Sequence, residues 1–109
     1  MTYRLRTLSR AHRDVTAILR WLTHERKSVA GANSWLRAYY TAIRKVVASP
    51  EGYGVAPEDE GEEPRVRQFL FKTRRGSVYR GLFILSADEI VILRIRGAGQ
   101  PPLEPDELR

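Results

Sequence analysis

The sequence predicts an α+β domain in which an N-terminal strand and an antiparallel two-helix hairpin pack on a small antiparallel β-sheet. In the first half, apolar residues recur at helical spacing over two stretches with a short connection between them. A chain of 109 residues has room for one domain, which we place over residues 1–109. In the second half, three apolar runs separated by tight turns are typical of an antiparallel meander: Val66–Phe71, Val78–Leu85 and Ile90–Ile95.

The first segment is predicted to be a short strand that leads into a helix. Over Thr2–Leu8, apolar side chains alternate with arginines, which is the period of a half-buried strand. Ser9 is a candidate N-cap for a helix over Arg10–Glu25. Asp14 lies near the start of that helix, where a negative charge is favourable.

A second helix is predicted to begin after Ser28, a second candidate N-cap, and to end at Pro50 and Gly52. We interpret Trp21 and Trp35 as packing residues, because large aromatic side chains at helical spacing usually face a core. The second helix carries one apolar stripe, formed by Ala32, Trp35, Leu36, Tyr39, Ile43, Val46 and Val47.

Two further segments are predicted to lack regular structure. Residues Glu51–Pro64 form a loop that contains Glu58–Glu63, an acidic run in a basic protein. We interpret this run as a solvated, mobile loop, and the alternative is that it shields the arginines of the sheet. The glycines and prolines of 97–109 predict an extended or mobile C-terminal tail.

Strand alternation predicts which side chains share a face of the sheet. The simplest assignment leaves Arg80, Arg94 and Arg96 together on an open face. An open face that is both apolar and cationic is typical of a binding groove. In the alternative, Arg94 pairs with an acidic neighbour and the tail covers the apolar residues. The assignment packs Phe83, Val91, Leu93 and Ile95 against the helices and leaves Val78, Leu82 and Ile84 partly exposed beside the arginines.

Composition limits the possible functions. The 19 Lys and Arg residues exceed the 13 Asp and Glu residues, giving a net charge of +6. This charge indicates an anionic partner, either nucleic acid or an acidic protein, or simply a solvated basic surface. The chain has no cysteine, which excludes disulfides and thiolate chemistry. His12 and His24 lack metal-ligand spacing, so we expect no metal and no cofactor. No apolar run is as long as a membrane span, and we expect a cytoplasmic protein.

Several segments, in order along nearly the whole chain, resemble the toxins of the RelE/ParE superfamily from bacterial toxin–antitoxin systems. The central hairpin of that family has a Tyr-Arg pair, which stands here at Tyr79-Arg80. The resemblance implies the same fold, with two helices on an antiparallel sheet. The matching segments are Arg10–Val15, Ile18–Leu22, Ala38–Ile43, Val66–Phe71, Gly76–Arg80 and Ile92–Gly97.

The resemblance also implies a cognate antitoxin, with which the chain forms a hetero-oligomer. Antitoxins of this class are commonly acidic where they bind the toxin, which suits a basic chain. The family has two branches. RelE-like members cleave messenger RNA on the ribosome, and ParE-like members, known from plasmid stabilisation, inhibit DNA gyrase without cutting RNA. The residues expected to contact a partner are Arg67, Val78, Arg80, Leu82, Ile84, Arg94 and Arg96.

The sequence lacks some of the residues that the resemblance leads us to expect for RNA cleavage. Arg80 and Arg96 match the positions of family arginines, but Gln68 and Leu70 stand where a pair of lysines is expected. After the last strand comes Gln100 instead of a Tyr or His. Acid–base catalysis needs a group that exchanges a proton, and arginine stays protonated. We therefore favour the ParE-like function. In the RelE-like alternative, Arg80 and Arg96 would bind the phosphate.

In that alternative the proton acceptor is not identified, and Glu104 and Asp106 are the candidates in the tail. Tyr79 is not one of them, because it is predicted to point inward when Arg80 points outward. A third possibility, a plain nucleic-acid-binding module, is disfavoured because the sequence predicts no exposed aromatic residues on the sheet and no recognition helix.

Overall fold

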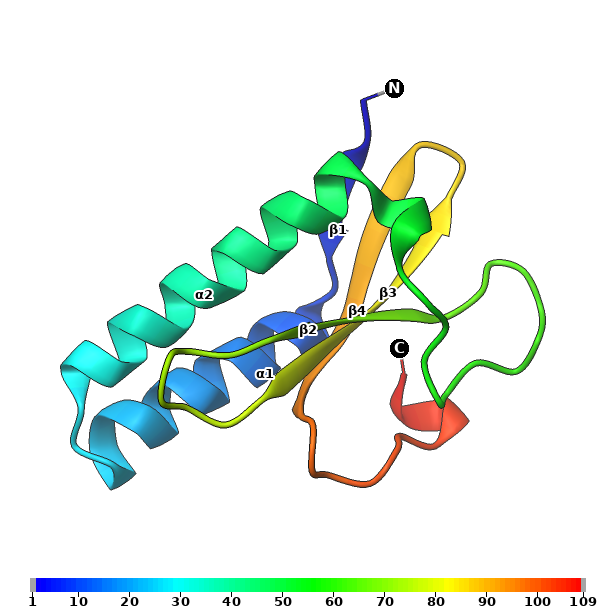
Figure 1. Cartoon of the computed structure of the whole chain (residues 1–109). Coiled ribbons are helices and arrows are strands. Elements are labelled where there is room, and N and C mark those ends of the chain that lie inside the picture. The colour runs from blue at the N-terminus through cyan, green and yellow to red at the C-terminus, as the bar shows by residue number, and fades with distance from the viewer. Residues whose placement is uncertain (1, 109) are drawn as a thin grey trace.

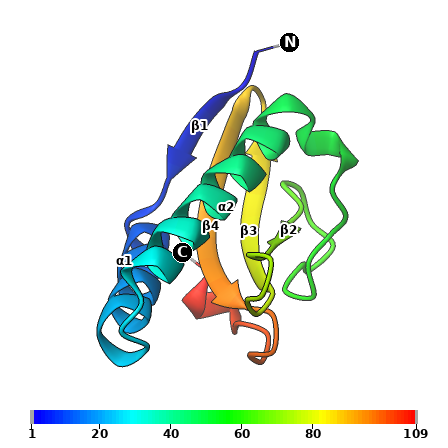
Figure 2. The same cartoon turned by 60° about the vertical axis from the view of Figure 1, so that its left-hand side comes forward.

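The computed structural model describes residues 2–108 and has the predicted element order (Figure 1). The helices α1 and α2 lie on one face of a four-stranded sheet, and the C-terminal segment lies on the other (Figure 2). The fold class predicted from the sequence is therefore confirmed. The elements are β1 (Arg4–Thr7), α1 (Ser9–Arg20) with a π-helical turn (Trp21–Glu25), α2 (Val29–Ala48), β2 (Arg67–Phe71), β3 (Tyr79–Ser86), β4 (Glu89–Gly97) and two short 3₁₀ turns (Pro50–Gly52 and Pro105–Glu107).

The two helix starts differ in how they are capped. Ser28 caps α2 as predicted, because its Oγ accepts a hydrogen bond from the backbone N–H of Gly31 at 2.9 Å. In α1 the N-cap is Leu8 and not Ser9, and no side chain within residues 2–108 caps that end. Asp14 is predicted to stabilise the start of α1 through the helix dipole. Its carboxylate instead binds Arg94 and the backbone of β4.

The sheet has the order β1-β4-β3-β2. The β2–β3 and β3–β4 pairs are antiparallel, as the meander predicts, but β1 runs parallel to β4. The sheet is therefore mixed, a detail that differs from the predicted antiparallel sheet. The backbone N–H of Leu8 donates to the carbonyl of Ile92 at 3.0 Å, so β1 ends beside the middle of β4. The remainder of β4 has no strand neighbour on that side in the described part of the chain.

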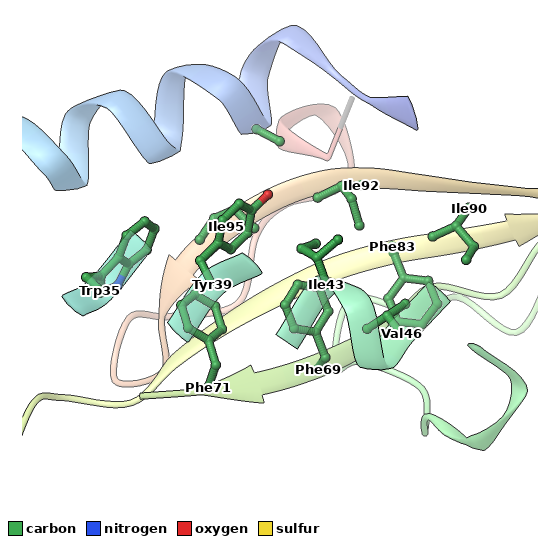
Figure 3. Packing of buried hydrophobic residues seen from close by; sticks show 11 residues of the cluster. Trp35, Tyr39, Ile43, Val46, Phe69, Phe71, Phe83, Ile90, Ile92 and Ile95 are labelled. Carbon is green, nitrogen blue, oxygen red and sulfur yellow. The ribbon is translucent and has the colours of Figure 1, made fainter. Parts of the chain in front are cut away.

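The main core lies between α2 and the sheet (Figure 3). Of the predicted apolar stripe of α2, five residues are buried and Leu36 and Val47 are half-buried. Trp35 stacks on Tyr39 with ring centroids 5.6 Å apart, which confirms the predicted packing role of Trp35. The side chains that meet in this core include Trp35, Tyr39, Ile43, Val46, Phe69, Phe71, Phe83, Ile90, Ile92 and Ile95.

A β-bulge corrects the predicted faces of β4. Leu82 pairs with Arg94, but the next residue of β3, Phe83, pairs with Ile92, so Leu93 is an extra residue in β4. One inserted residue reverses the alternation on one side of it. Phe83 and Ile95 pack on the helix side as predicted. Val91 and Leu93, predicted to face the helices, pack on the opposite face.

That opposite face is covered, so the prediction of an open groove is wrong and the alternative, in which the tail covers the apolar residues and Arg94 pairs with an acidic residue, is confirmed. Leu82 is fully buried and Ile84 is 7% exposed, whereas Val78 is exposed. The predicted extended or mobile tail folds back, and its two leucines are buried. The second core consists of Leu82, Ile84, Val91 and Leu93 from the sheet, Ala56 and Val66 from the loop, and Leu103 and Leu108 from the tail.

Candidate functional site

The strand register brings three of the predicted arginines together. Arg80 of β3 lies opposite Arg96 of β4, and Leu82 lies opposite Arg94. Because Leu82 packs in the second core, this register places the three arginines on the face that the tail covers. Each of the three guanidinium groups is bound by another part of the chain.

Arg80 is sealed in a buried ion pair with Glu58. The Arg80 Nη1–Glu58 Oε1 and Nη2–Oε2 distances are 2.8 and 2.5 Å, and the two residues are 5% and 7% exposed. Oε2 of Glu58 also accepts a hydrogen bond from the backbone N–H of Leu103 at 2.8 Å. Burial favours a higher pKa for Glu58, but the hydrogen bonds from Arg80 and Leu103 outweigh it and lower the pKa of that carboxyl. The acidic run thus shields an arginine, which was the alternative interpretation of the sequence.

Arg94 is held by Asp14 of α1. Its Nε and Nη2 atoms lie 2.8 and 3.0 Å from the two carboxylate oxygens, and the hydrogen bonds to Asp14 raise the pKa of Arg94. Asp14 also accepts a hydrogen bond from the backbone N–H of Ile95 at 2.9 Å, where β4 extends beyond β1. Nη1 of Arg94 donates to the carbonyl of Glu107. The guanidinium therefore joins α1, β4 and the tail.

The other two predicted arginines also hold covering segments. Nη1 of Arg67 donates to the carbonyl of Tyr53 at 2.6 Å, and Nη2 of Arg96 donates to the carbonyl of Pro101 at 3.0 Å. Arg96 keeps one buried Nε without a hydrogen-bond partner within residues 2–108. In this fold the arginines of the sheet form hydrogen bonds and ion pairs that hold the loop and the tail in place.

Within residues 2–108, the candidate proton acceptors form no salt bridge with these arginines. Glu104 and Asp106 are exposed, and the Glu104 backbone N–H is capped by the Glu107 side chain. Tyr79 points inward as predicted, with its ring 5.5 Å from that of Trp35, and burial raises its pKa. Among the described residues, the acid–base side chain that contacts Arg80 is Glu58.

Sequence reasoning singled out none of four residues for their roles in this region, although its alternatives included a shielding acidic run, an acidic partner for Arg94 and a covering tail. The acidic run in a basic chain could have indicated that Glu58 is a counter-ion. Leu103 and Leu108 are apolar residues in a proline-rich tail, which could have indicated that they are buried. No feature of the sequence indicated Asp14 as the partner of Arg94, because the two residues are 80 positions apart.

One end of the molecule remains open. Trp21, predicted to pack in the core, is 45% exposed there. It separates two clefts that it lines together with Tyr79. The β4 cleft, of about 400 Å³, lies between α1 and the end of β4 and includes Arg94 and Arg96. The hairpin cleft, of about 300 Å³, lies between the α1–α2 connection and the β2–β3 turn.

No family model and no curated protein matches the sequence. Two solved structures share the fold. A chain from the chromosomal ParDE TA system of P. aeruginosa has a TM-score of 0.58 and 17% identity, covering 88% of this chain and 96% of that one. A mutant E. coli toxin RelE in the free state has a TM-score of 0.56 and 14% identity, covering 91% of this chain and 86% of that one.

This chain has a RelE/ParE-like fold. The resemblance seen in the sequence is thus confirmed for the fold. In this RelE/ParE-like domain, residues 2–108 contain no cluster of side chains arranged to hold a metal ion. None of the described helices has the length and apolar character needed to cross a membrane.

Proposed function

We propose that this chain is the toxin of a type II toxin–antitoxin system, neutralised by a cognate antitoxin, and that it inhibits DNA gyrase in the ParE-like manner. The fold shared with the ParDE chain and with RelE supports a toxin. The net charge of +6 supports an acidic antitoxin that binds in a hetero-oligomer. The proposed site of action is the cytoplasm, where gyrase and ribosomes are found.

One observation favours the ParE-like mechanism: Arg80 is saturated by a buried carboxylate under the tail. A cation that stabilises charge on a scissile phosphate must reach it, and a proton must be exchanged nearby. Here the guanidinium is neutralised by Glu58, and the lowered pKa of Glu58 makes this carboxyl a poor acid at neutral pH. These features support a toxin that binds its target without cutting RNA.

A specific observation keeps ribosome-dependent messenger RNA cleavage as the second candidate. Arg80 and Arg96 lie opposite each other, and Nε of Arg96 has no partner among the described residues. If the tail and the loop moved away, the two guanidinium groups would lie on the same open face of the sheet, where both could contact a phosphate. In the folded chain Glu58, rather than Glu104 or Asp106, is the carboxylate that contacts Arg80.

The burial of two residues changes the set of predicted antitoxin contacts. Leu82 and Ile84 are buried, so an antitoxin reaches them only by displacing the tail. Val78 is 38% exposed and is the accessible apolar member of the predicted set. We expect Val78→Asp to weaken antitoxin binding while the domain stays folded, whereas Leu82→Asp should unfold it. Unchanged antitoxin affinity in Val78→Asp would remove this position from the interface.

The deciding experiment is a paired assay on the purified chain with and without antitoxin. One arm measures DNA supercoiling by gyrase, and the other measures messenger RNA cleavage on translating ribosomes. The proposal predicts that supercoiling is lost, that RNA stays intact, and that antitoxin restores supercoiling. Cleaved RNA with normal supercoiling would instead establish the RelE-like candidate, and Arg80→Ala and Arg96→Ala should then abolish cleavage. An inactive chain in both arms would contradict the toxin proposal.

A further inference from the structure

An exposed tryptophan lies at the end of the molecule where three segments meet. The α1–α2 connection, the β2–β3 turn and the end of β4 lie at this end in both views (Figures 1 and 2). Trp21 belongs to the π-helical turn that follows α1. Its ring is open to solvent, and with Tyr79 it lines both the β4 cleft and the hairpin cleft. Aromatic surface of this kind is available for stacking.

The two clefts are cationic. Arg26 and Arg75 line the hairpin cleft, and neither forms a salt bridge within residues 2–108. The Arg26 guanidinium carbon lies 5.5 Å from the centre of the Trp21 ring, so charge and aromatic surface are adjacent. In the β4 cleft, Asp14 is the acidic lining residue, and Arg94 occupies its carboxylate. The net field at this end therefore favours an anion.

Each cleft is also lined by a residue with a buried hydrogen-bond donor that has no partner in the described chain. Trp35 lines the hairpin cleft, is 3% exposed, and has an unpartnered Nε1. Arg96 lines the β4 cleft and has an unpartnered Nε. A buried donor without an acceptor is costly, and a ligand that brings acceptor atoms relieves that cost. Both donor atoms are themselves buried, so oxygen acceptors of a ligand reach them only when the lining side chains move.

We propose that the clefts on either side of Trp21 bind single-stranded nucleic acid. A base stacks on the free face of Trp21, and phosphate oxygens lie against Arg26 and Arg75 in one cleft and Arg96 in the other. Flat aromatic surface interleaved with cations is the combination that binds unpaired strands. Cleft volumes of about 400 and 300 Å³ are large enough for one nucleotide each. An acidic peptide would use the cations but would gain little from the exposed indole ring.

This site shares Arg96 with the RelE-like candidate but is independent of the proposed gyrase inhibition, and binding of oligonucleotides tests it directly. We would measure fluorescence anisotropy of labelled ten-residue oligo(U) and oligo(dT) with the full-length chain. Trp21→Ala should weaken binding by roughly tenfold, since stacking of one base is worth that order of affinity. The matched control is Tyr40→Ala, which removes an aromatic side chain that is 52% exposed on α2 and lines neither cleft. Equal losses in both variants, or no loss in Trp21→Ala, would overturn the proposal.

A salt titration tests the cationic part of the site. Arg75→Ala should reduce the slope of log affinity against log salt by about 0.7, as expected when one phosphate contact on a single strand is lost. Arg44→Ala, an exposed arginine of α2 outside the clefts, should leave the slope unchanged. Competition by oligoglutamate as effective as unlabelled oligo(U) would assign the site to acidic peptides and overturn the proposal. Comparison of oligo(U) with oligo(dT) shows whether RNA or DNA is preferred.

Discussion

Arg80 and Glu58 are paired side by side beneath the C-terminal tail, with N–O distances of 2.8 and 2.5 Å and almost no exposure to solvent. The same carboxylate accepts the backbone N–H of Leu103. One buried acidic residue therefore binds β3 and the tail while it neutralises an arginine that the RelE-like alternative would need to contact phosphate.

Loss of Glu58 should destabilise the domain strongly. Glu58→Ala leaves Arg80 buried and unpaired, and we expect a decrease of about 3–5 kcal/mol in the free energy of unfolding, measured by urea titration. Glu60→Ala is the matched control, because Glu60 is exposed in the same loop and should change stability by less than about 0.5 kcal/mol. Replacing both partners, as Glu58→Leu with Arg80→Met, should recover most of the loss. Similar stability of Glu58→Ala and Glu60→Ala would show that the ion pair contributes nothing.

The same pair predicts a dependence of stability on pH. The pKa of Glu58 is lower in the folded chain than its ordinary value. Its stabilising contribution is therefore fully present above the unfolded-state pKa, about 4.3, and is lost as pH falls through the lower folded-state pKa. Urea titrations between pH 7 and pH 3 should show wild-type stability falling in that acid range. Glu58→Gln should show a shallower fall, and parallel pH profiles would contradict the assignment.

Gly81 is required by the close approach of an aromatic ring. A Cβ atom at this position would lie 2.1 Å from Cζ of Phe69, inside the main core. Gly81→Ala should therefore lower the free energy of unfolding by about 1–3 kcal/mol, as overpacking does. Gly99→Ala, where a Cβ would meet no atom of the described residues within 4 Å, should be close to neutral. A thermal melt of the two variants checks the difference, and equal melting temperatures would be inconsistent with this packing.

The tail should contribute to stability through its buried leucines. Leu103 is 5% exposed in the second core, and Leu103→Ala should cost about 2–5 kcal/mol. Leu70→Ala removes a leucine that is 59% exposed on β2 and should change stability by less than about 0.5 kcal/mol. Urea unfolding provides the comparison. A neutral Leu103→Ala would mean that the tail does not pack on the sheet in solution.

The helices and the meander were predictable because they depend on neighbours in sequence. The apolar stripe of α2 and the cap at Ser28 involve residues three or four positions apart. The β2–β3 and β3–β4 pairings follow from apolar runs joined by short turns. The predicted placement of Arg80, Arg94 and Arg96 on one face is also confirmed, because Arg80 and Arg96 lie opposite each other in the β3–β4 ladder.

The nature of the candidate site was not predictable in the same way. Whether the arginine face is open or covered depends on where the tail lies, and apolar Leu103 and Leu108 predict burial without naming the surface that buries them. A single bulge at Leu93 reverses the faces of β4, and alternation in sequence does not show where a bulge falls. The exposure of Trp21 likewise depends on what the surrounding segments leave uncovered.

By itself, the sequence determined the elements, their order, the fold class and the basic character of this protein, because these depend on local spacing and composition. Only the tertiary structure decided which charges are free. The carboxylate of Glu58 lies 22 residues from Arg80, and that of Asp14 lies 80 residues from Arg94. Such pairs form only after the chain has closed long loops, so their energy is set by the packed fold and not by any neighbouring residue.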